Sequence, residues 1–140
     1  MPGPDRRRHS QRENADAVAR YLGDLQAEVL AVLWRLGDAT VREVVEELNA
    51  NRRRKLAYTT VLTIVSRLSA RALLSRTPEG RGFRYRPTKT REELLAELSD
   101  ELIDRLIDDF GEIALAQLGA RIDGLDADRR AQLKALRDNG

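Results

Sequence analysis

The sequence predicts a mainly α-helical protein with one β-hairpin. Apolar residues recur at helical spacing through most of the chain after residue 23, which is typical of amphipathic helices. One stretch departs from that pattern: in GRGFRYRP, residues 80–87, aromatic residues alternate with arginines after two closely spaced glycines. Alternation is typical of a strand and glycine permits a tight turn, so residues 73–86 are expected to form the hairpin.

Three short helices are expected before the hairpin. The first begins at Asp24, a good N-cap, and ends at Gly37, while the second opens with a capping box made by Thr40 and Glu43. The third spans about Tyr58 to Ala72, and its apolar stripe is Val61, Ile64, Val65 and Leu68. Helices this short need one another to bury their stripes, which predicts a trihelical core.

Length and composition restrict the class of protein. A chain of 140 residues forms one compact domain, or one small domain with an appendage. Charged residues interrupt every apolar run before it could cross a bilayer, and the N-terminus MPGPDRRRHSQRE has no apolar secretion segment. The absence of cysteine excludes disulfides and thiolate metal sites, and it fits a reducing compartment. Because the N-terminus lacks a secretion segment, we expect a cytoplasmic protein. We expect no metal or other cofactor.

The net charge of +2 conceals a difference between the two halves. Residues 1–89 contain 18 Lys and Arg against 10 Asp and Glu, whereas residues 90–140 contain 7 against 13. A basic front half suits a polyanionic partner, and an acidic rear half does not. Residues 1–22 show no apolar periodicity and are expected to be a basic, mostly disordered arm, or simply a solvated tail.

Helix, loop, helix and hairpin follow one another in the order of a winged helix-turn-helix domain, expected over residues 23–88. The third helix would then enter the major groove of double-stranded DNA with its polar outer face, and the hairpin would place arginines against phosphates. The four-cation loop 52–55 adds to the positive field. The expected DNA-binding residues are Thr59, Thr60, Thr63, Arg67, Arg81 and Arg84.

Residues 89–140 are expected to form a helical dimerisation domain. Thr90 and Glu93 make a second capping box, and the apolar stripe that follows is too long for so small a front domain to cover. Packing onto the trihelical core is the alternative; a two-fold homodimer would bury the stripe and present two recognition helices to one inverted repeat. The expected dimerisation residues are Leu94, Leu98, Leu102, Leu106, Phe110 and Leu118.

Catalysis finds no support in the sequence. The single histidine, His9, lies in the basic arm, and no Ser/His/Asp set or phosphate-binding glycine loop is present. The chain is therefore not expected to be an enzyme. Two other classes stay open beside a DNA-binding regulator: a protein–protein interaction module built on a winged helix, and a repressor that responds to a small molecule.

Three segments carry a resemblance to a known family: LGDLQAEVLAVLW at 22–34, AYTTVLTIVSRL at 57–68 and GRGFRYRP at 80–87. They resemble the penicillinase repressor (BlaI/MecI-type) family of winged-helix transcriptional repressors. The resemblance implies a homodimeric repressor that binds an inverted-repeat operator and controls genes of β-lactam resistance or the cell wall. It assigns DNA contacts to the same outer face of the third helix.

The chain departs from the family at two places. Copper-responsive relatives carry paired cysteines near the C-terminus, and this chain has no cysteine. The family is typically inactivated by cleavage at an Asn-Phe pair, triggered by a membrane-bound metalloprotease sensor. No Asn-Phe pair occurs here, and the corresponding region reads Gln117-Leu118-Gly119-Ala120.

Overall fold

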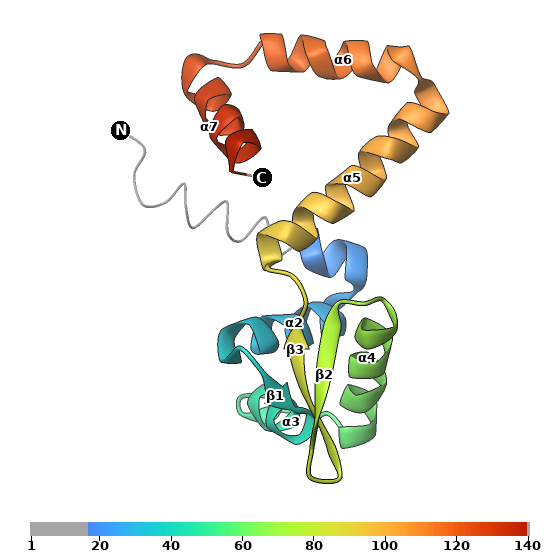
Figure 1. The fold of residues 1–140 in the computed structure, drawn as a ribbon, viewed down its shortest axis with the longest axis vertical. Helices are drawn as coiled ribbons and strands as arrows, with labels where there is room; N and C mark the ends of the chain where they lie inside the picture. The colour runs from blue at the N-terminus through green and yellow to red at the C-terminus, as the bar shows by residue number, and fades with distance from the viewer. Residues whose placement is uncertain (1–16, 140) are drawn as a thin grey trace. The chain divides into compact units, whose positions relative to one another are not determined.

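The computed structural model describes residues 17–139, which form two compact units divided between Leu98 and Ser99. After a short helix at residues 17–22, the first unit contains α2 (Asp24–Leu36), β1 (Ala39–Thr40), α3 (Val41–Asn49), α4 (Tyr58–Ala70), β2 (Leu74–Glu79) and β3 (Gly82–Pro87). The helix α5 (Arg91–Phe110) begins in the first unit and ends in the second, which also holds α6 (Glu112–Asp123) and α7 (Ala127–Asp138). The mainly helical winged-helix fold predicted from the sequence is therefore confirmed (Figure 1).

The helix at residues 17–22 corrects the expectation of a disordered arm over residues 1–22. Val18 and Leu22 lie one helical turn apart, and both are buried in the core of the first unit. Gly23, with a φ of 101°, ends this helix, and its amide donates to the carbonyl of Ala19. The arginines and His9 that precede Ala17 lie outside the described residues.

Glycines set both ends of α2. Asp24 is the first helical residue rather than the predicted N-cap, because Gly23 occupies the capping position and no side chain caps the helix there. Gly37 ends the helix as predicted: its φ of 87° is in the left-handed region, and its amide donates to the Leu33 carbonyl at 2.8 Å.

The β-hairpin belongs to a three-stranded antiparallel sheet with β3 in the centre, in the order β1-β3-β2. Glu79 pairs with Gly82, so the turn consists of Gly80 and Arg81 alone. Gly80 has a φ of 61°, which suits glycine at this position. In Figure 1 the hairpin extends beyond the ends of α3 and α4.

The trihelical core forms as predicted. Val61, Ile64, Val65 and Leu68 of α4 are all buried, against α2 and α3. Tyr85 of β3 packs against the core from the sheet side. It pairs with Ala39 of β1, and Ala39 is fully buried. The short strand β1 was not predicted, and it ties the start of α3 to the hairpin.

The beginning of α5 belongs to the first unit. The capping box predicted at Thr90 and Glu93 is present, because each residue's backbone amide bonds the other's side chain. Leu94 and Leu98 are 2% and 9% exposed and lie in the core cluster of this unit. These two leucines are thus buried within one copy of the chain, which corresponds to the alternative of intramolecular packing rather than to a dimer face.

The second unit buries few of its apolar side chains. Asp126 caps α7, accepting from the amide of Arg129 at 2.8 Å. Between residues 99 and 139 only Ala114 is buried. The large apolar side chains exposed here are Leu102, Ile103, Leu106, Phe110, Ile113, Leu115, Ile122, Leu133 and Leu136. Across the described part of the chain, no helix meets the length and hydropathy needed to span a membrane.

Candidate nucleic-acid interface

The outer face of α4 carries the predicted polar set. Thr59, Thr60, Thr63 and Arg67 are all exposed, while the opposite stripe of the helix is buried. The hydroxyl of Thr63 donates to the carbonyl of Thr59 at 2.9 Å, and no acidic side chain within the described residues pairs with Arg67. This face therefore combines short hydroxyls, methyl groups and the exposed guanidinium of Arg67, a set of groups that can meet base edges in a major groove.

Two apolar residues of the same face were missed by the sequence reasoning. Tyr58 is 48% exposed at the first position of α4, and Leu62 is 37% exposed one turn later. Leu62 lies between Thr59 and Thr63 on the side away from the core, a spacing that the helical period could have revealed. An exposed aliphatic side chain among threonines suits contact with a thymine methyl group.

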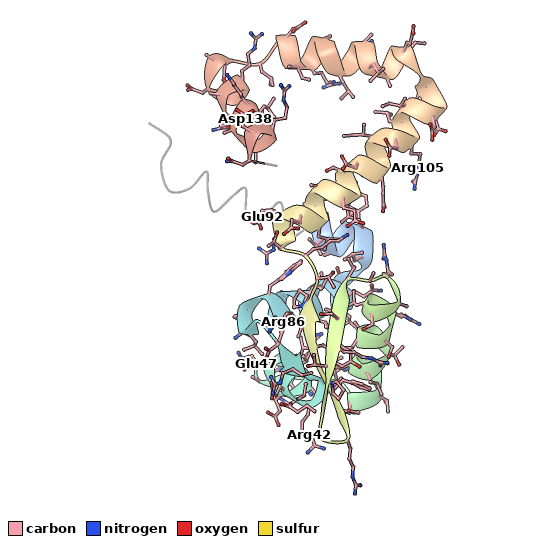
Figure 2. All side chains as sticks on the ribbon, viewed as in Figure 1. Arg42, Glu47, Arg86, Glu92, Arg105 and Asp138 are labelled. Carbon is pink, nitrogen blue, oxygen red and sulfur yellow. The ribbon has the colours of Figure 1, made fainter. Side chains whose placement is uncertain are left out.

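Arg81 lies at the tip of the hairpin, where it is exposed and has no carboxylate partner among residues 17–139. Behind it, the guanidinium of Arg76 lies 4.0 Å from the centre of the Phe83 ring, and Phe83 meets Tyr85 edge to face at 6.4 Å. These contacts stiffen the hairpin on its aromatic side. Figure 2 shows Arg42 of α3 at the same end of the first unit as this tip.

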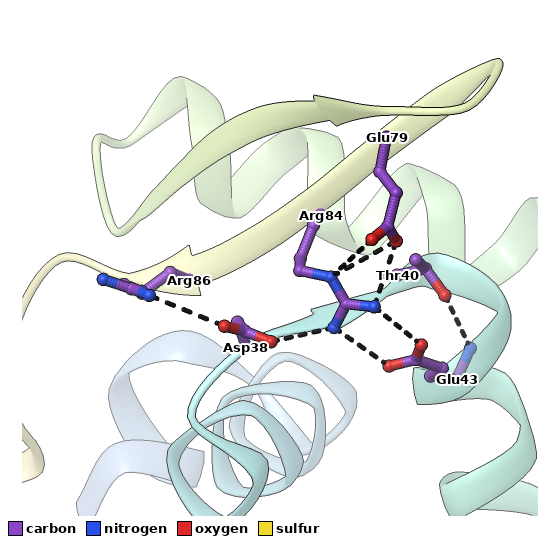
Figure 3. A network of polar contacts seen from close by, with 6 residues as sticks. All are labelled: Asp38, Thr40, Glu43, Glu79, Arg84 and Arg86. Carbon is purple, nitrogen blue, oxygen red and sulfur yellow. Dashed lines mark hydrogen bonds and ion pairs between the residues drawn. The ribbon is translucent and has the colours of Figure 1, made fainter.

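Arg84 lies in a different environment from Arg81. Its side chain is 29% exposed, and its guanidinium contacts three carboxylates: Asp38 at 2.8 Å, Glu43 at 3.0 Å and Glu79 at 3.0 Å (Figure 3). Arg86, which is 70% exposed, adds a looser contact of 3.5 Å to Asp38. The sequence placed Arg84 among the DNA-contacting residues, but the structure directs it toward acidic groups of the protein itself.

The charges in this network stabilise one another. The hydrogen bond from Arg84 holds the pKa of Asp38 below its usual value of 3.8, and Arg86 acts in the same direction. Hydrogen bonds to Glu79, Asp38 and Glu43 raise the pKa of Arg84 further above its ordinary range. Glu43 turns its carboxylate to Arg84, so only half of the predicted capping box forms, with the Glu43 amide donating to the Thr40 hydroxyl at 3.2 Å.

The basic loop, residues 52–55, is closed at its base by a side-chain clamp. Asn49 accepts from the amide of Leu56 at 2.8 Å and donates to the Leu56 carbonyl at 3.0 Å. Arg52 pairs with Glu28 at 3.0 Å, and Lys55 donates to the Asn49 carbonyl. Two exposed cations, at positions 53 and 54, have no acidic partner among residues 17–139 and strengthen the positive field.

The same loop borders a groove of about 1080 Å³ in the first unit. Leu25, Trp34 and Leu56 contribute apolar lining, and Arg54 and Arg91 contribute positive charge. The guanidinium of Arg91 lies 5.3 Å from the centre of the Trp34 ring, and its Nε is buried with no hydrogen-bond partner among residues 17–139. Trp34 itself donates from Nε1 to the Lys89 carbonyl at 2.8 Å.

The residues expected at a dimer interface fall into two groups. Leu94 and Leu98 are core residues of the first unit, as described above. In the second unit, Leu102, Leu106 and Phe110 are exposed on one face of α5, where they line a hollow of about 320 Å³, and Leu118 of α6 is half-buried. The unpartnered apolar face therefore begins at Leu102, two turns later than the sequence indicated.

The chain is similar to proteins of one regulatory family. The family profile described as "Penicillinase repressor" matches residues 22–139. The transcriptional regulator BlaI of Mycobacterium tuberculosis is 40% identical over 114 residues, which cover 79% of this chain and 81% of that protein.

Solved structures also match. The DNA-binding domain of the repressor BlaI is 30% identical, with a TM-score of 0.43, over 48% of this chain and 79% of that one. The transcriptional regulator Tm0710 from Thermotoga maritima is 22% identical, with a TM-score of 0.48, over 91% of this chain and 86% of that one.

Proposed function

Because the chain belongs to the penicillinase repressor family of DNA-binding transcriptional repressors, we propose that it acts as a homodimer on an inverted-repeat operator. The regulated genes would be those of β-lactam resistance or of related cell-wall functions, in keeping with its relationship to a BlaI regulator. The basic first unit would meet the DNA, and the acidic helical unit would hold the two copies together.

The exposed face of α4 carries this proposal. Thr59, Thr63 and Arg67 project from a helix whose other side is locked into the core, so the face is held rigidly. Rigid presentation lowers the conformational entropy lost on binding and favours direct readout of base edges. Arg81 at the hairpin tip and the basic loop would supply phosphate contacts, which set the position and orientation of the helix on the duplex.

Exposed apolar surface supports the homodimer. Nine large apolar side chains of the second unit are at least one third exposed, the least of them Leu102 at 36%. A monomer rarely leaves so many large apolar side chains in water, since burying them in a partner is favourable by about 25 cal/mol per Å². A second copy provides a self-complementary surface, and two-fold symmetry matches an inverted repeat.

Operator binding at several salt concentrations tests the proposal. If each dimer neutralises roughly six to ten phosphates, the slope of log K against log salt concentration is about −0.9 for each of them. The operator would be found by selecting bound fragments from the genome, and a scrambled duplex serves as control. A flat salt response, or equal affinity for both duplexes, would contradict the proposal.

Regulation by a membrane-bound metalloprotease sensor is proposed on the family relationship alone. The region Gln117–Ala120, where the Asn-Phe pair would be expected, lies inside helix α6. Proteases cleave extended backbone, so cutting at this point requires that α6 first unfold locally. Mass spectrometry of the chain recovered from β-lactam-treated cells would reveal fragments, and an intact chain under derepressing conditions argues against this route.

The groove beside Trp34 favours a second candidate, a repressor that responds to a small molecule. Its apolar lining, its arginines and the buried Nε of Arg91, which has no hydrogen-bond partner within the described part of the chain, suit a carboxylate on an apolar body. Trp34 is the single tryptophan of the chain, so its fluorescence reports on this groove directly. Laurate should change that fluorescence and shift operator affinity, whereas acetate and dodecanol should not; an unchanged signal with laurate removes the candidate.

A further inference from the structure

We propose that Arg84 is a positioning residue that fixes the hairpin wing to β1 and α3, and that it is not a phosphate ligand. The inference rests on the proposed function in assigning the wing a role in DNA binding. Its basis is a single guanidinium that joins three separate parts of the first unit. Asp38 precedes β1, Glu43 lies in the first turn of α3, and Glu79 ends β2 (Figure 3).

The contacts use all the donor nitrogens of Arg84. Its Nε donates to both carboxylate oxygens of Glu79 at 3.2 Å. Its Nη1 donates to Asp38 at 2.8 Å and to Glu43 at 3.4 Å, while its Nη2 donates to Glu43 and to Glu79, both at 3.0 Å. A guanidinium has five N–H groups in a fixed plane, so no nitrogen is left for a phosphate unless a carboxylate is displaced.

The location of these carboxylates explains what the arrangement does to the wing. Arg84 pairs with Thr40 across β1 and β3, and with Thr77 across β2 and β3, so it occupies the middle of the sheet. The hairpin otherwise leans on the trihelical core through few buried side chains, chiefly Leu74 and Tyr85. Ionic contacts to α3 therefore restrain the hairpin on its solvent-facing side.

Arg84 also offsets part of the negative charge next to the tip. Glu79 immediately precedes the turn formed by Gly80 and Arg81. Without Arg84, its carboxylate would be free beside the one guanidinium that the tip offers to a phosphate, and it would weaken that attraction. Because Glu79 is ion-paired with Arg84, its carboxylate competes less with a phosphate for Arg81 at the tip. A mutation of Arg84 is thus expected to harm DNA binding even though Arg84 itself does not touch the DNA.

Hydrogen exchange in the absence of DNA tests the structural half of the proposal. Arg84→Gln should speed exchange of the β2 and β3 amides on the order of fivefold, because several exposed ion pairs disappear together. Arg35→Gln is the matched control, since it removes one positive charge and one exposed ion pair, Arg35–Glu47, away from the wing. Equal exchange in Arg84→Gln and the unmodified chain would overturn the proposal.

The salt dependence of operator binding tests the other half. Arg81→Gln should reduce the magnitude of the log–log slope by about 0.9 for each phosphate that is no longer neutralised. Arg84→Gln should lower affinity several-fold at every salt concentration while its slope stays close to that of Arg35→Gln. A slope change as large as that of Arg81→Gln identifies Arg84 as a phosphate ligand and refutes our assignment.

Two further variants separate positioning from folding. Arg84→Lys keeps the charge but not the planar fork, and should fall between the unmodified chain and Arg84→Gln in exchange and affinity. In Arg84→Gln/Glu79→Gln the exposed carboxylate beside the tip is gone, so part of the affinity should return; no recovery would contradict the neutralising role. If the unmodified chain fails to bind any operator, the proposed function falls, while the exchange experiment still decides the role of Arg84.

Discussion

The hydroxyl of Thr63 donates a hydrogen bond to the backbone carbonyl of Thr59, one turn earlier on the exposed face of α4, at 2.9 Å. Because this bond uses the hydroxyl proton, Thr63 presents only acceptor lone pairs and a methyl group to an approaching partner. The arrangement favours bases that offer an amino group or a methyl group in the major groove. Arg67, one turn further on, supplies the strong donor that Thr63 lacks.

Arg67→Ala should therefore weaken operator binding by about 1–3 kcal/mol and relax the base preference at one position of each half-site. Fluorescence anisotropy with operator variants measures both effects. Lys134→Ala is the control, since it removes one exposed charge from α7, outside the proposed interface. Equal weakening on operator and scrambled DNA would show that Arg67 contacts only phosphate.

Leu94 and Leu98 should behave as core residues of the first unit. Leu94→Ala removes a side chain that is 2% exposed and is expected to cost about 2–5 kcal/mol of folding free energy. Thermal unfolding followed by circular dichroism gives the change. Leu102→Ala, at an exposed position on the same helix, should leave the stability of the first unit almost unchanged. A comparable loss of stability in both variants would contradict the assignment of Leu94, but not Leu102, to the core of the first unit.

Leu102→Asp or Leu106→Asp should give a monomer with little operator affinity. A carboxylate in the centre of an apolar interface loses its hydration without gaining a partner, and a single half-site lacks the avidity of two. Analytical ultracentrifugation measures the oligomeric state, with Asp104→Asn on the same helix as control. A dimer that persists in both leucine variants would place the interface elsewhere.

Low pH should release the wing network. The pKa of Asp38 is depressed in the folded chain by Arg84, so ionised Asp38 adds stability above its unfolded pKa. That contribution is lost as the pH falls from about 3.8 through the lower folded value. An NMR titration of the Asp38 carboxyl should show its pKa rising toward 3.8 in Arg84→Gln; an identical titration in both chains would mean that the ion pair does not form in solution.

Local signals in the sequence were sufficient for the helices and the hairpin. The stripe of α4, the box at Thr90 and Glu93 and the cap at Asp126 each depend on residues within a few positions of one another, so periodicity and capping chemistry reveal them. The helix at residues 17–22 was missed because Val18 and Leu22 alone, in a charged segment, give no recognisable period.

Features that depend on tertiary contacts could not be read in this way. Strand β1 has two residues and exists only because β3 lies beside it. Arg84 alternates with aromatic residues like any solvent-facing strand residue, yet its partner Asp38 is 46 positions away in the chain. Leu94 and Leu98 continue the same stripe as Leu102, and only the packed core shows where burial within one copy ends.

The two hydrogen bonds between Asn49 and Leu56 hold the ends of the basic loop together, so α3 and α4 do not depend on which residues the loop contains. Both hydrogen bonds join the ends of that segment, so the number of arginines between them can change while α3 and α4 keep their relative placement. Long-range attraction to a polyanion governs how fast two molecules meet, and it depends on that number. Substitutions at positions 53 and 54 should therefore adjust the rate of encounter with DNA while leaving unchanged the exposed face of α4 that we propose contacts the bases.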